Sequence, residues 1–382
     1  MTSENIPDLH TFRWFLPTSI RSKEKYFEFD LTNVCQIFFS NSHYYARRTT
    51  FDHKADYDQT VTSAIRTVKV KLYPFNVAPM SNTREALNII ENEIGPTPEL
   101  VHIINRGNLR HAHGLAILEI TLSEGFDSPP NLQSEEEYDI EKRLNWDMDF
   151  EIWKLQLISI ASDIGAFFML GLHLTYPTHS TWHESHPPQS SGLAAINGSG
   201  CYLVDEHSDM LAYPLLFEAD RFGTLNLIWE RIAKVWHKDL WSLHRFIKAV
   251  RSDHNTIDHF VDLVVTLESF FPDNTPQPMM RLISGTIVGI SKVEAKKIDK
   301  LLLDCFRIRN EVVHGGRYYR LHDKGNANAD GKMILQLFWE LKNLNINLIH
   351  YGIDKLLNDH NPISANAIRL GADDILEKVF KL

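Results

Sequence analysis

One stretch near the end of the chain decides the expected fold of its C-terminal half: Leu301-Leu-Leu-Asp-Cys-Phe-Arg-Ile-Arg-Asn-Glu-Val-Val-His-Gly-Gly316. Its apolar residues recur at the spacing of one helix face, and two glycines follow. Because glycine readily takes the left-handed backbone that ends many helices, the stretch predicts the last turns of an amphipathic helix. The same helix end gathers an arginine, an asparagine and a histidine, so it is the first place to look for chemistry.

The predicted helix has one apolar and one polar face when its residues are placed at 100° intervals. The apolar stripe, which predicts packing into a helical bundle, consists of Ile298, Leu301, Leu302, Cys305, Ile308 and Val312. Arg307, Asn310 and His314 fall on the opposite face. Arg309 falls at the edge of the apolar stripe, where a guanidinium requires an acceptor, and Glu268 on the preceding helical segment is a candidate partner.

These side-chain types suit chemistry on a phosphate ester. A histidine such as His314 can give or take a proton near neutral pH. A planar guanidinium, as in Arg309, can hold two phosphate oxygens and stabilise growing negative charge. Asn310 can orient either group. The competing interpretation is a chance pair of polar residues on a surface helix.

Charge around this helix end differs from that of the whole chain, which has a formal net charge of -10. Between residues 305 and 324, acidic Glu311 and Asp323 are outnumbered by basic Arg307, Arg309, Arg317, Arg320 and Lys324. An acidic protein with a local basic pocket suits one or a few phosphates rather than a long duplex. Tyr318 and Tyr319 can stack on bases. We therefore expect Arg317, Tyr318 and Arg320 to contact phosphates or bases.

The residues Arg309-Asn-Glu-Val-Val-His314 match the Arg-polar-x-x-x-His motif of HEPN-domain ribonucleases. Their surroundings resemble the Apea-like branch of that superfamily, in which a Leu-Glu helix and an arginine-led helix precede the motif. Here the corresponding segments are Val265-Thr-Leu-Glu-Ser-Phe270 and Arg281-Leu-Ile-Ser-Gly285. The resemblance covers roughly residues 225 to 360.

The resemblance implies a metal-independent endoribonuclease without a cofactor, built as an all-α bundle. It also implies a homodimer with a composite active site, RNA ends of the 2′,3′-cyclic phosphate and 5′-OH type, and a role in bacterial antiphage defence, including abortive infection. His314 then moves the proton, Arg309 stabilises the phosphorane, Asn310 positions them and Glu268 supports the site. A toxin of a toxin–antitoxin pair is an alternative setting.

The geometry of the motif leaves one question open. In a straight helix Arg309 and His314 point about 140° apart, whereas Arg307 shares the face of His314. Either the last turn unwinds at the glycines, or the two residues contribute to the cleft differently. The resemblance favours Arg309 as the partner of His314, and the helical wheel favours Arg307.

Two further interpretations remain beside the ribonuclease. Many HEPN domains bind RNA or a nucleotide without cutting, which predicts binding without cyclic-phosphate products. A purely structural interpretation makes the bundle a dimerisation platform and His314 the capped end of a helix.

The chain as a whole predicts an α+β protein of 382 residues in three parts. Residues 1–130 form a β-rich accessory or sensing domain, 131–205 a connector of helix and loop, and 206–382 an HEPN-like helical bundle. Constitutive RNA cleavage is toxic, so we expect control by an activating ligand or a neutralising partner, through residues 1–205.

Local patterns place the individual elements. Period-2 alternation predicts strands over 26–31, 67–73, 100–104 and 115–122. Helical spacing predicts helices over 81–93, 149–174, 224–237, 240–250, 256–271, 279–290, 293–314, 332–358 and 365–382. Loops are expected over 125–141 and 176–200, which are rich in Pro, Ser, Gly, His or acidic residues.

Composition also bounds the compartment and the cofactors. Three widely spaced cysteines, Cys35, Cys201 and Cys305, suit a reducing cytoplasm. The N-terminus lacks the pattern of a secretory signal, and the apolar run over 155–174 contains polar residues, so we expect a buried helix and no membrane contact. A loop with His179, Glu184 and two further histidines (His183, His186) is one residue short of a paired zinc motif, and we expect no metal.

Overall fold

The structure is a computed structural model, and it describes residues 10–18, 22–39, 61–75, 79–94, 114–123, 137–176, 192–196, 200–204, 221–235, 240–251, 257–314, 329–358 and 368–375. The predicted strand over 100–104 lies outside these ranges, as does most of the predicted helix over 365–382.

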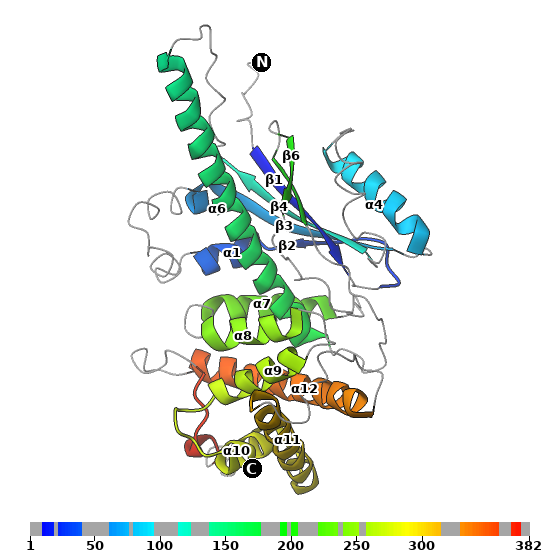
Figure 1. Ribbon diagram of the computed structural model, residues 1–382, viewed down its shortest axis with the longest axis vertical. Helices are drawn as coiled ribbons and strands as arrows, with labels where there is room; N and C mark the ends of the chain where they lie inside the picture. Colours follow the sequence, from blue (N-terminus) through cyan, green and yellow to red (C-terminus); the bar gives the residue numbers. More distant parts are fainter. Residues whose placement is uncertain are drawn as a thin grey trace. The chain divides into compact units, whose positions relative to one another are not determined.

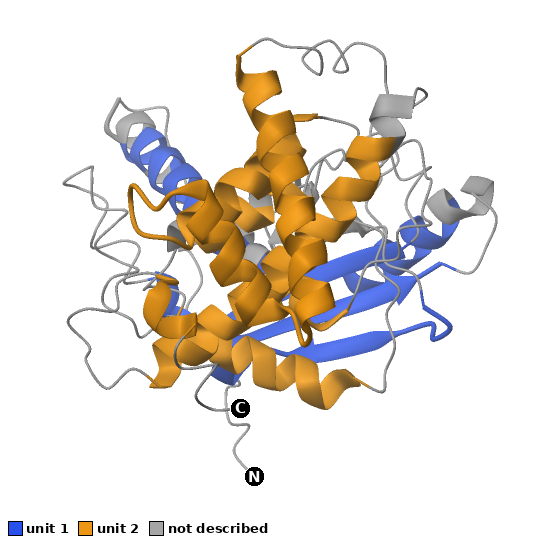
Figure 2. Ribbon diagram, turned by 90° about the horizontal axis from the view of Figure 1, so that it is seen from below, with its two compact units in different colours: residues 1–165, 188–211 blue, residues 166–187, 212–382 orange. Residues whose placement is uncertain are grey.

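The chain divides into two compact units (Figure 2). Unit 1 comprises residues 1–165 and 188–211, and unit 2 comprises 166–187 and 212–382. This division differs from the boundaries expected after residues 130 and 205, because helix α6 runs without a break from Glu137 to Thr175 and contributes to both units. The α+β class is confirmed, since strands and helices are both present in separate parts of the chain.

Unit 1 is built on an antiparallel sheet, in which the described strands follow the order β2-β3-β4-β1-β5-β6 (Figure 1). The strands are β1 (His10–Thr18), β2 (Phe27–Asp30), β3 (Ile65–Pro74), β4 (Gly114–Leu122), β5 (Gly192–Ile196) and β6 (Gly200–Val204). Strands β2, β3 and β4 correspond to predicted strands. Their alternation has the expected result, because Val68, Val70 and Leu72 of β3 are buried on one face.

Strands β1, β5 and β6 have no counterpart in the sequence-based prediction. Strand β1 is central: Phe12 pairs with Ile120 of β4 on one side and Ile196 of β5 on the other. Phe12, Trp14 and Phe15 are all buried, so β1 shows no clean alternation of apolar and polar residues. The prediction of a loop over 176–200 is wrong for residues 192–196, which form β5. This strand is held by pairing with β1, about 180 positions earlier in the sequence.

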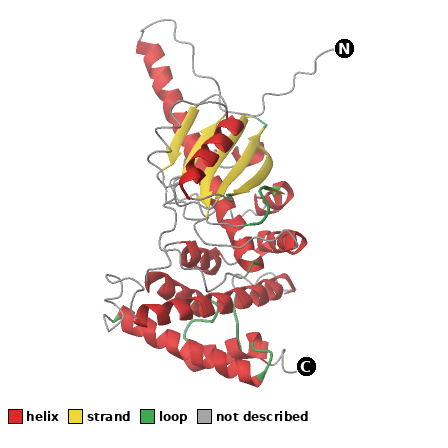
Figure 3. Cartoon of the chain, turned by 90° about the vertical axis from the view of Figure 1, so that its right-hand side faces the viewer, coloured by secondary structure: helices red, strands yellow, loops and turns green. Residues whose placement is uncertain are grey.

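Two helices of unit 1 pack on the sheet. Helix α4 (Pro79–Ile94) covers one face, where Ala86 and Ile90 pack against Phe15, Leu115 and Ile117 (Figure 3). Helix α1 (Thr32–Phe39), which the sequence analysis did not predict, contacts β3. The Thr32 hydroxyl accepts a 3.1 Å hydrogen bond from the Val68 backbone N–H.

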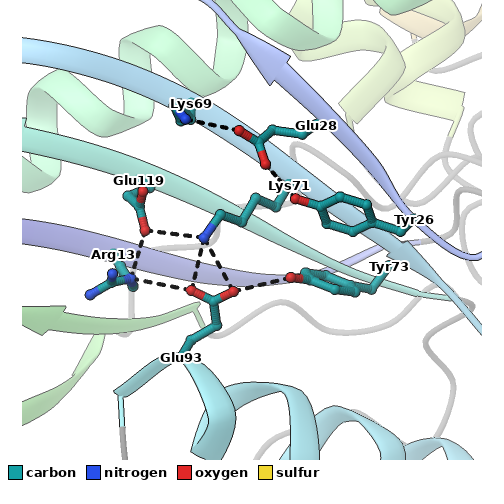
Figure 4. A network of polar contacts seen from close by, with 8 residues as sticks. All are labelled: Arg13, Tyr26, Glu28, Lys69, Lys71, Tyr73, Glu93 and Glu119. Carbon is teal, nitrogen blue, oxygen red and sulfur yellow. Dashed lines mark hydrogen bonds and ion pairs between the residues drawn. The ribbon is translucent and has the colours of Figure 1, made fainter.

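A polar network extends along the face that α4 covers (Figure 4). Lys71 Nζ lies 2.9 Å from Glu93 and 3.3 Å from Glu119, and Arg13 Nε donates to Glu119 at 2.8 Å. The remaining members are Tyr26, Glu28, Lys69 and Tyr73. Burial is the main cause that raises the pKa of Tyr26 and Tyr73, with the neighbouring glutamates adding to it. Three cations face three carboxylates, so the network leaves no net charge for a ligand and acts as a clamp between helix and sheet.

Unit 2 is helical throughout its described residues and includes the C-terminal end of α6. Its further helices are α7 (Phe222–Val235), α8 (Leu240–Arg251), α9 (Ile257–Ser269), α10 (Gln277–Val288), α11 (Lys292–Val313) and α12 (Ala329–Asn358). Each overlaps a predicted helix, because the apolar period of 3.6 residues is strong throughout this part of the sequence. Helix α6 begins at Glu137, earlier than predicted and inside the expected loop over 125–141.

Close contacts fix how the helices of unit 2 pack. Trp229 of α7 stacks on Phe168 of α6 with ring centroids 5.1 Å apart, and its Nε1 donates to the Phe168 carbonyl. Gly171 makes room for this indole, since a Cβ there would lie 2.1 Å from Trp229 Nε1. Asn345 of α12 is fully buried and donates a 3.1 Å hydrogen bond to the Leu263 carbonyl of α9.

A lysine and a histidine meet in the core of unit 2. Lys342 of α12 and His173 of α6 are both buried, and Lys342 Nζ lies 3.1 Å from His173 Nδ1. Burial lowers the pKa of both groups well below their usual values, and the neighbouring lysine lowers that of His173 further. Both shifts favour the neutral forms of the amine and the imidazole.

Helix α6 contains the apolar run that the sequence analysis interprets as a buried helix. By length and composition, its residues 142–175 are the one described segment that passes the test for a spanning helix. Most of its apolar window is buried inside the protein, as the sequence analysis expects of a core helix.

Replacing Lys342 with methionine tests the cost of the buried amine. Burial lowers the pKa of this amine in the folded chain, whereas the unfolded chain protonates it below about pH 10.4. The free energy of unfolding therefore falls as the pH is lowered from that value toward neutrality. We expect Lys342→Met to raise it by about 1 to 4 kcal/mol at pH 7, with a smaller gain at about pH 9.5, in denaturant titrations. Lys297→Met, at an exposed lysine, serves as the control, and a loss of stability in Lys342→Met at pH 7 contradicts the prediction.

Candidate functional site

The candidate site lies at the C-terminal end of helix α11, beside helix α9 (Figure 1). The helix begins at a capping box: the Ser291 hydroxyl accepts from the Glu294 backbone N–H, and the Glu294 carboxylate accepts from the Ile290 backbone N–H. Its buried residues are Leu302, Cys305, Phe306, Ile308 and Val312. The predicted apolar stripe thus faces the core, although Ile298 and Leu301 at its start are only partly buried.

Arg309 is held by an ion pair that joins α11 to α9. Its Nη2 lies 2.8 Å from Glu268 Oε2, so the partner expected from the sequence is in contact with it. Its Nη1 donates a 2.9 Å hydrogen bond to the side-chain oxygen of Asn310. The side chains of Arg309 and Glu268 are 27% and 21% exposed, so the pair lies at the edge of the core with part of the guanidinium open to solvent.

Two opposing effects act on the pKa of the Glu268 carboxyl. Burial raises the pKa of the Glu268 carboxyl above its usual value, while the charge and hydrogen bond of Arg309 act to lower it. Burial dominates, so the carboxylate depends on Arg309 for its charged form. Removing either partner leaves the other charge half-buried and uncompensated.

Arg309 has donors to spare for a further acceptor. A guanidinium carries five N–H groups, and the two contacts above occupy one on each terminal nitrogen. Its Nε is buried and has no hydrogen-bond partner among the described residues. The second hydrogens of Nη1 and Nη2 therefore remain to meet a phosphate oxygen at the exposed part of the group.

His314 is the C-cap of α11 and is exposed. Its backbone N–H donates to the Asn310 carbonyl at 3.0 Å, the bond of an ordinary helical turn. The helix therefore stays regular up to His314, and the backbone still directs Arg309 and His314 about 140° apart. The unwinding expected at the glycines concerns Gly315 and Gly316, which lie outside the described residues, so it stays a prediction beside the alternative in which the two residues contribute to a cleft differently.

Arg307 is the arginine on the open side of the helix. Its side chain is 59% exposed and lies 3.2 Å from Asp304, one turn earlier on α11. An exposed pair of this kind is weak, so Arg307 is free to exchange its partner for a stronger anion. Arg307 and His314 share a face, as the wheel predicts, whereas Arg309 is committed to Glu268.

Several predicted residues lie outside the described part of the chain. These are the glycines and the RNA-contact residues after the helix (Gly315, Gly316, Arg317, Tyr318, Arg320) and the histidine-rich loop with His179, His183, Glu184 and His186. Among the described residues no group of three or more His, Cys, Asp or Glu side chains is placed to hold a metal ion.

The sequence analysis did not single out the lysines of the first half of α11. Lys292, Lys296, Lys297 and Lys300 are all exposed. Three of them, Lys292, Lys296 and Lys300, are spaced four residues apart. This spacing is visible in the sequence, and residues four apart share a helix face.

Comparisons with known proteins give no assignment. No protein-family model, no curated protein and no solved structure matches this chain.

Truncating Glu268 tests whether the ion pair holds α9 and α11 together. We expect Glu268→Ala to lower the free energy of unfolding by about 1 to 2 kcal/mol, because Arg309 is left without its carboxylate in a half-buried position. The matched control is Asp304→Ala, which removes the exposed partner of Arg307 and should change stability by less than about 0.5 kcal/mol. Equal effects of the two variants in denaturant titrations contradict the prediction.

Proposed function

We propose that this protein is a metal-independent endoribonuclease of the HEPN type, resembling the Apea-like branch, with its active site at the end of α11. The observation that carries the proposal is the set formed by Glu268, Arg309, Asn310 and His314. In that set a guanidinium is fixed by a carboxylate and an amide, five residues before an exposed imidazole. The all-helical surroundings of the set in unit 2 agree with it.

The proposed reaction is a transesterification within RNA. The ribose 2′-oxygen attacks the adjacent phosphorus, a new P–O2′ bond forms, and the bond from phosphorus to the 5′-oxygen breaks. The products are a 2′,3′-cyclic phosphate and a 5′-hydroxyl. His314 moves the proton, Arg309 stabilises the charge of the phosphorane, and Asn310 holds the guanidinium in place. Glu268 is a positioning residue that acts through Arg309.

The proposed active form is a homodimer. Within one chain the backbone of α11 directs Arg309 and His314 to different sides. Two copies of the helix end, placed around one cleft, supply an arginine from one chain and a histidine from the other. Arg307, exposed on the His314 side, is the competing phosphate contact.

The proposed setting is cytoplasmic and antiviral. Such an enzyme fits bacterial antiphage defence, including abortive infection, or the toxin of a toxin–antitoxin pair. Since uncontrolled RNA cleavage is harmful, we propose that an activating ligand or neutralising partner acts on residues 1–205. Arg317, Tyr318 and Arg320 remain the proposed RNA contacts beyond the helix.

One observation favours a second function, an RNA- or nucleotide-binding module that does not cut. Arg309 is already paired with Glu268, and a guanidinium held in this way can serve binding and structure alone. This alternative predicts RNA affinity without cyclic-phosphate products.

Cleavage in the presence of EDTA tests the ribonuclease proposal. We expect purified protein to cut single-stranded RNA and to leave 2′,3′-cyclic phosphate ends, which end-mapping identifies. His314→Ala and Arg309→Ala should each lower the rate at least about 100-fold, because each removes proton transfer or charge stabilisation in the transition state. Arg307→Ala should lower it less than about tenfold if Arg309 is the residue that meets the phosphorane.

Thermal unfolding of each variant separates lost chemistry from lost fold. Undiminished cleavage by His314→Ala and Arg309→Ala contradicts the proposal, as does a lack of cleavage across varied RNAs. A larger loss from Arg307→Ala than from Arg309→Ala assigns the phosphate contact to the exposed arginine.

A further inference from the structure

A row of basic residues follows the open face of α11 toward His314. Placed at 100° intervals, Lys292, Lys296, Lys300, Arg307 and His314 fall within a sector about 80° wide. All five side chains are exposed. Leu303 and Asn310 occupy the intervening positions of the same sector. We call this row the α11 basic stripe.

The lysines of the stripe have no carboxylate to neutralise them within the described residues. The structure gives Lys292, Lys296 and Lys300 no ion pair with any described side chain, and Arg307 has only the exposed contact to Asp304. On a protein with a formal net charge of -10, three lysines in a row without an ion pair among the described residues are a local exception. Such a row attracts a polyanion at close range.

The acidic residues of α11 all fall outside the stripe. They are Glu294, Asp299, Asp304 and Glu311. Asp299 lies 3.4 Å from Arg281 of α10, and Glu294 caps the helix N-terminus, so two of the four are engaged away from the lysines. Asp299 and Glu311 lie about 20° beyond the two edges of the stripe and Asp304 about 40° beyond, so the stripe itself is basic but carboxylates flank it.

The spacing of the stripe suits an extended nucleic-acid strand. Lys292, Lys296 and Lys300 are about 6 Å apart along the axis, comparable to the distance between neighbouring phosphates of an extended single strand, whereas the steps to Arg307 and on to His314 are about 10.5 Å each. From Lys292 to His314 the stripe spans about 33 Å, enough for several nucleotides. Leu303, 53% exposed in the middle of the row, offers an apolar contact to a base.

We infer that the α11 basic stripe is a track that binds the backbone of single-stranded RNA and leads it to His314. This inference deepens the proposed function and rests on it. A second copy of the same helix is a poor occupant of the stripe, because four cations on each copy would repel. The track engages phosphates on one side of the scissile bond, and the site at the helix end acts on the next phosphate along.

Binding of an uncleavable RNA tests the track directly. The probe is a single-stranded oligouridylate with 2′-O-methyl groups throughout, which lacks the attacking hydroxyl, and its Kd is measured against salt concentration. We expect the triple variant Lys292→Gln/Lys296→Gln/Lys300→Gln to reduce the slope of log Kd against log salt by about 2. Affinity at 0.1 M salt should fall by about tenfold to hundredfold.

A matched triple variant controls for net charge. Lys23→Gln/Lys25→Gln/Lys297→Gln removes the same three charges from exposed positions, one of them on α11 but outside the stripe. We expect it to change the slope by less than about 0.5. Circular dichroism and thermal unfolding confirm that both variants fold, since all six positions are exposed.

The outcomes separate the track from the catalytic proposal. Equal slopes for the stripe variant and the control, or no loss of RNA affinity in the stripe variant, overturn the track even if the wild-type protein cleaves RNA. A reduced slope in a protein that cuts no RNA supports the track and rejects the nuclease. An equal loss of affinity for a poly-glutamate probe overturns the assignment to RNA and makes the stripe a general polyanion surface.

Discussion

The contact between Arg309 and Glu268 is the interaction on which the proposed site depends. It is placed where the apolar face of α11 ends, so burial of that face brings the guanidinium against α9 without any further adjustment. Burial raises the pKa of the Glu268 carboxyl, and the charge and hydrogen bond of Arg309 act against that rise. Helix packing and ionisation therefore support each other at this one point.

The contact between Arg309 and Glu268 has opposite effects on the proposed chemistry. An arginine that holds two helices together is precisely oriented, which favours catalysis, but part of its hydrogen-bonding capacity is already used. The exposed Arg307 has the opposite properties, because its pair with Asp304 is weak and its position is loosely fixed. In the proposed site, Arg309 is therefore the oriented guanidinium, and Arg307 is the exposed cation that attracts a phosphate.

The helices of unit 2 follow from the sequence because they depend on helical spacing. Glu268 follows as a candidate partner because a guanidinium at the edge of an apolar stripe requires an acceptor, and Glu268 lies on the preceding helix. The sheet of unit 1 follows only in part. β1 carries buried residues on both faces and so hides its period, and β5 is a short Gly-Leu-Ala-Ala-Ile segment held by distant pairing. The regular turn at His314 likewise required the structure, since a helix followed by two glycines can unwind before or after the histidine.

The amide of Asn345 affects how α9 and α12 are aligned along their axes. It is buried in α12 and donates to the Leu263 carbonyl of α9, five residues before Glu268. Apolar side chains tolerate a helix sliding by one turn far better than a buried amide does, because the amide would lose its acceptor. A slide of one turn moves Glu268 by about 5.4 Å, which breaks its contact with Arg309. The buried amide of Asn345 therefore favours the register of α9 in which the guanidinium has its carboxylate.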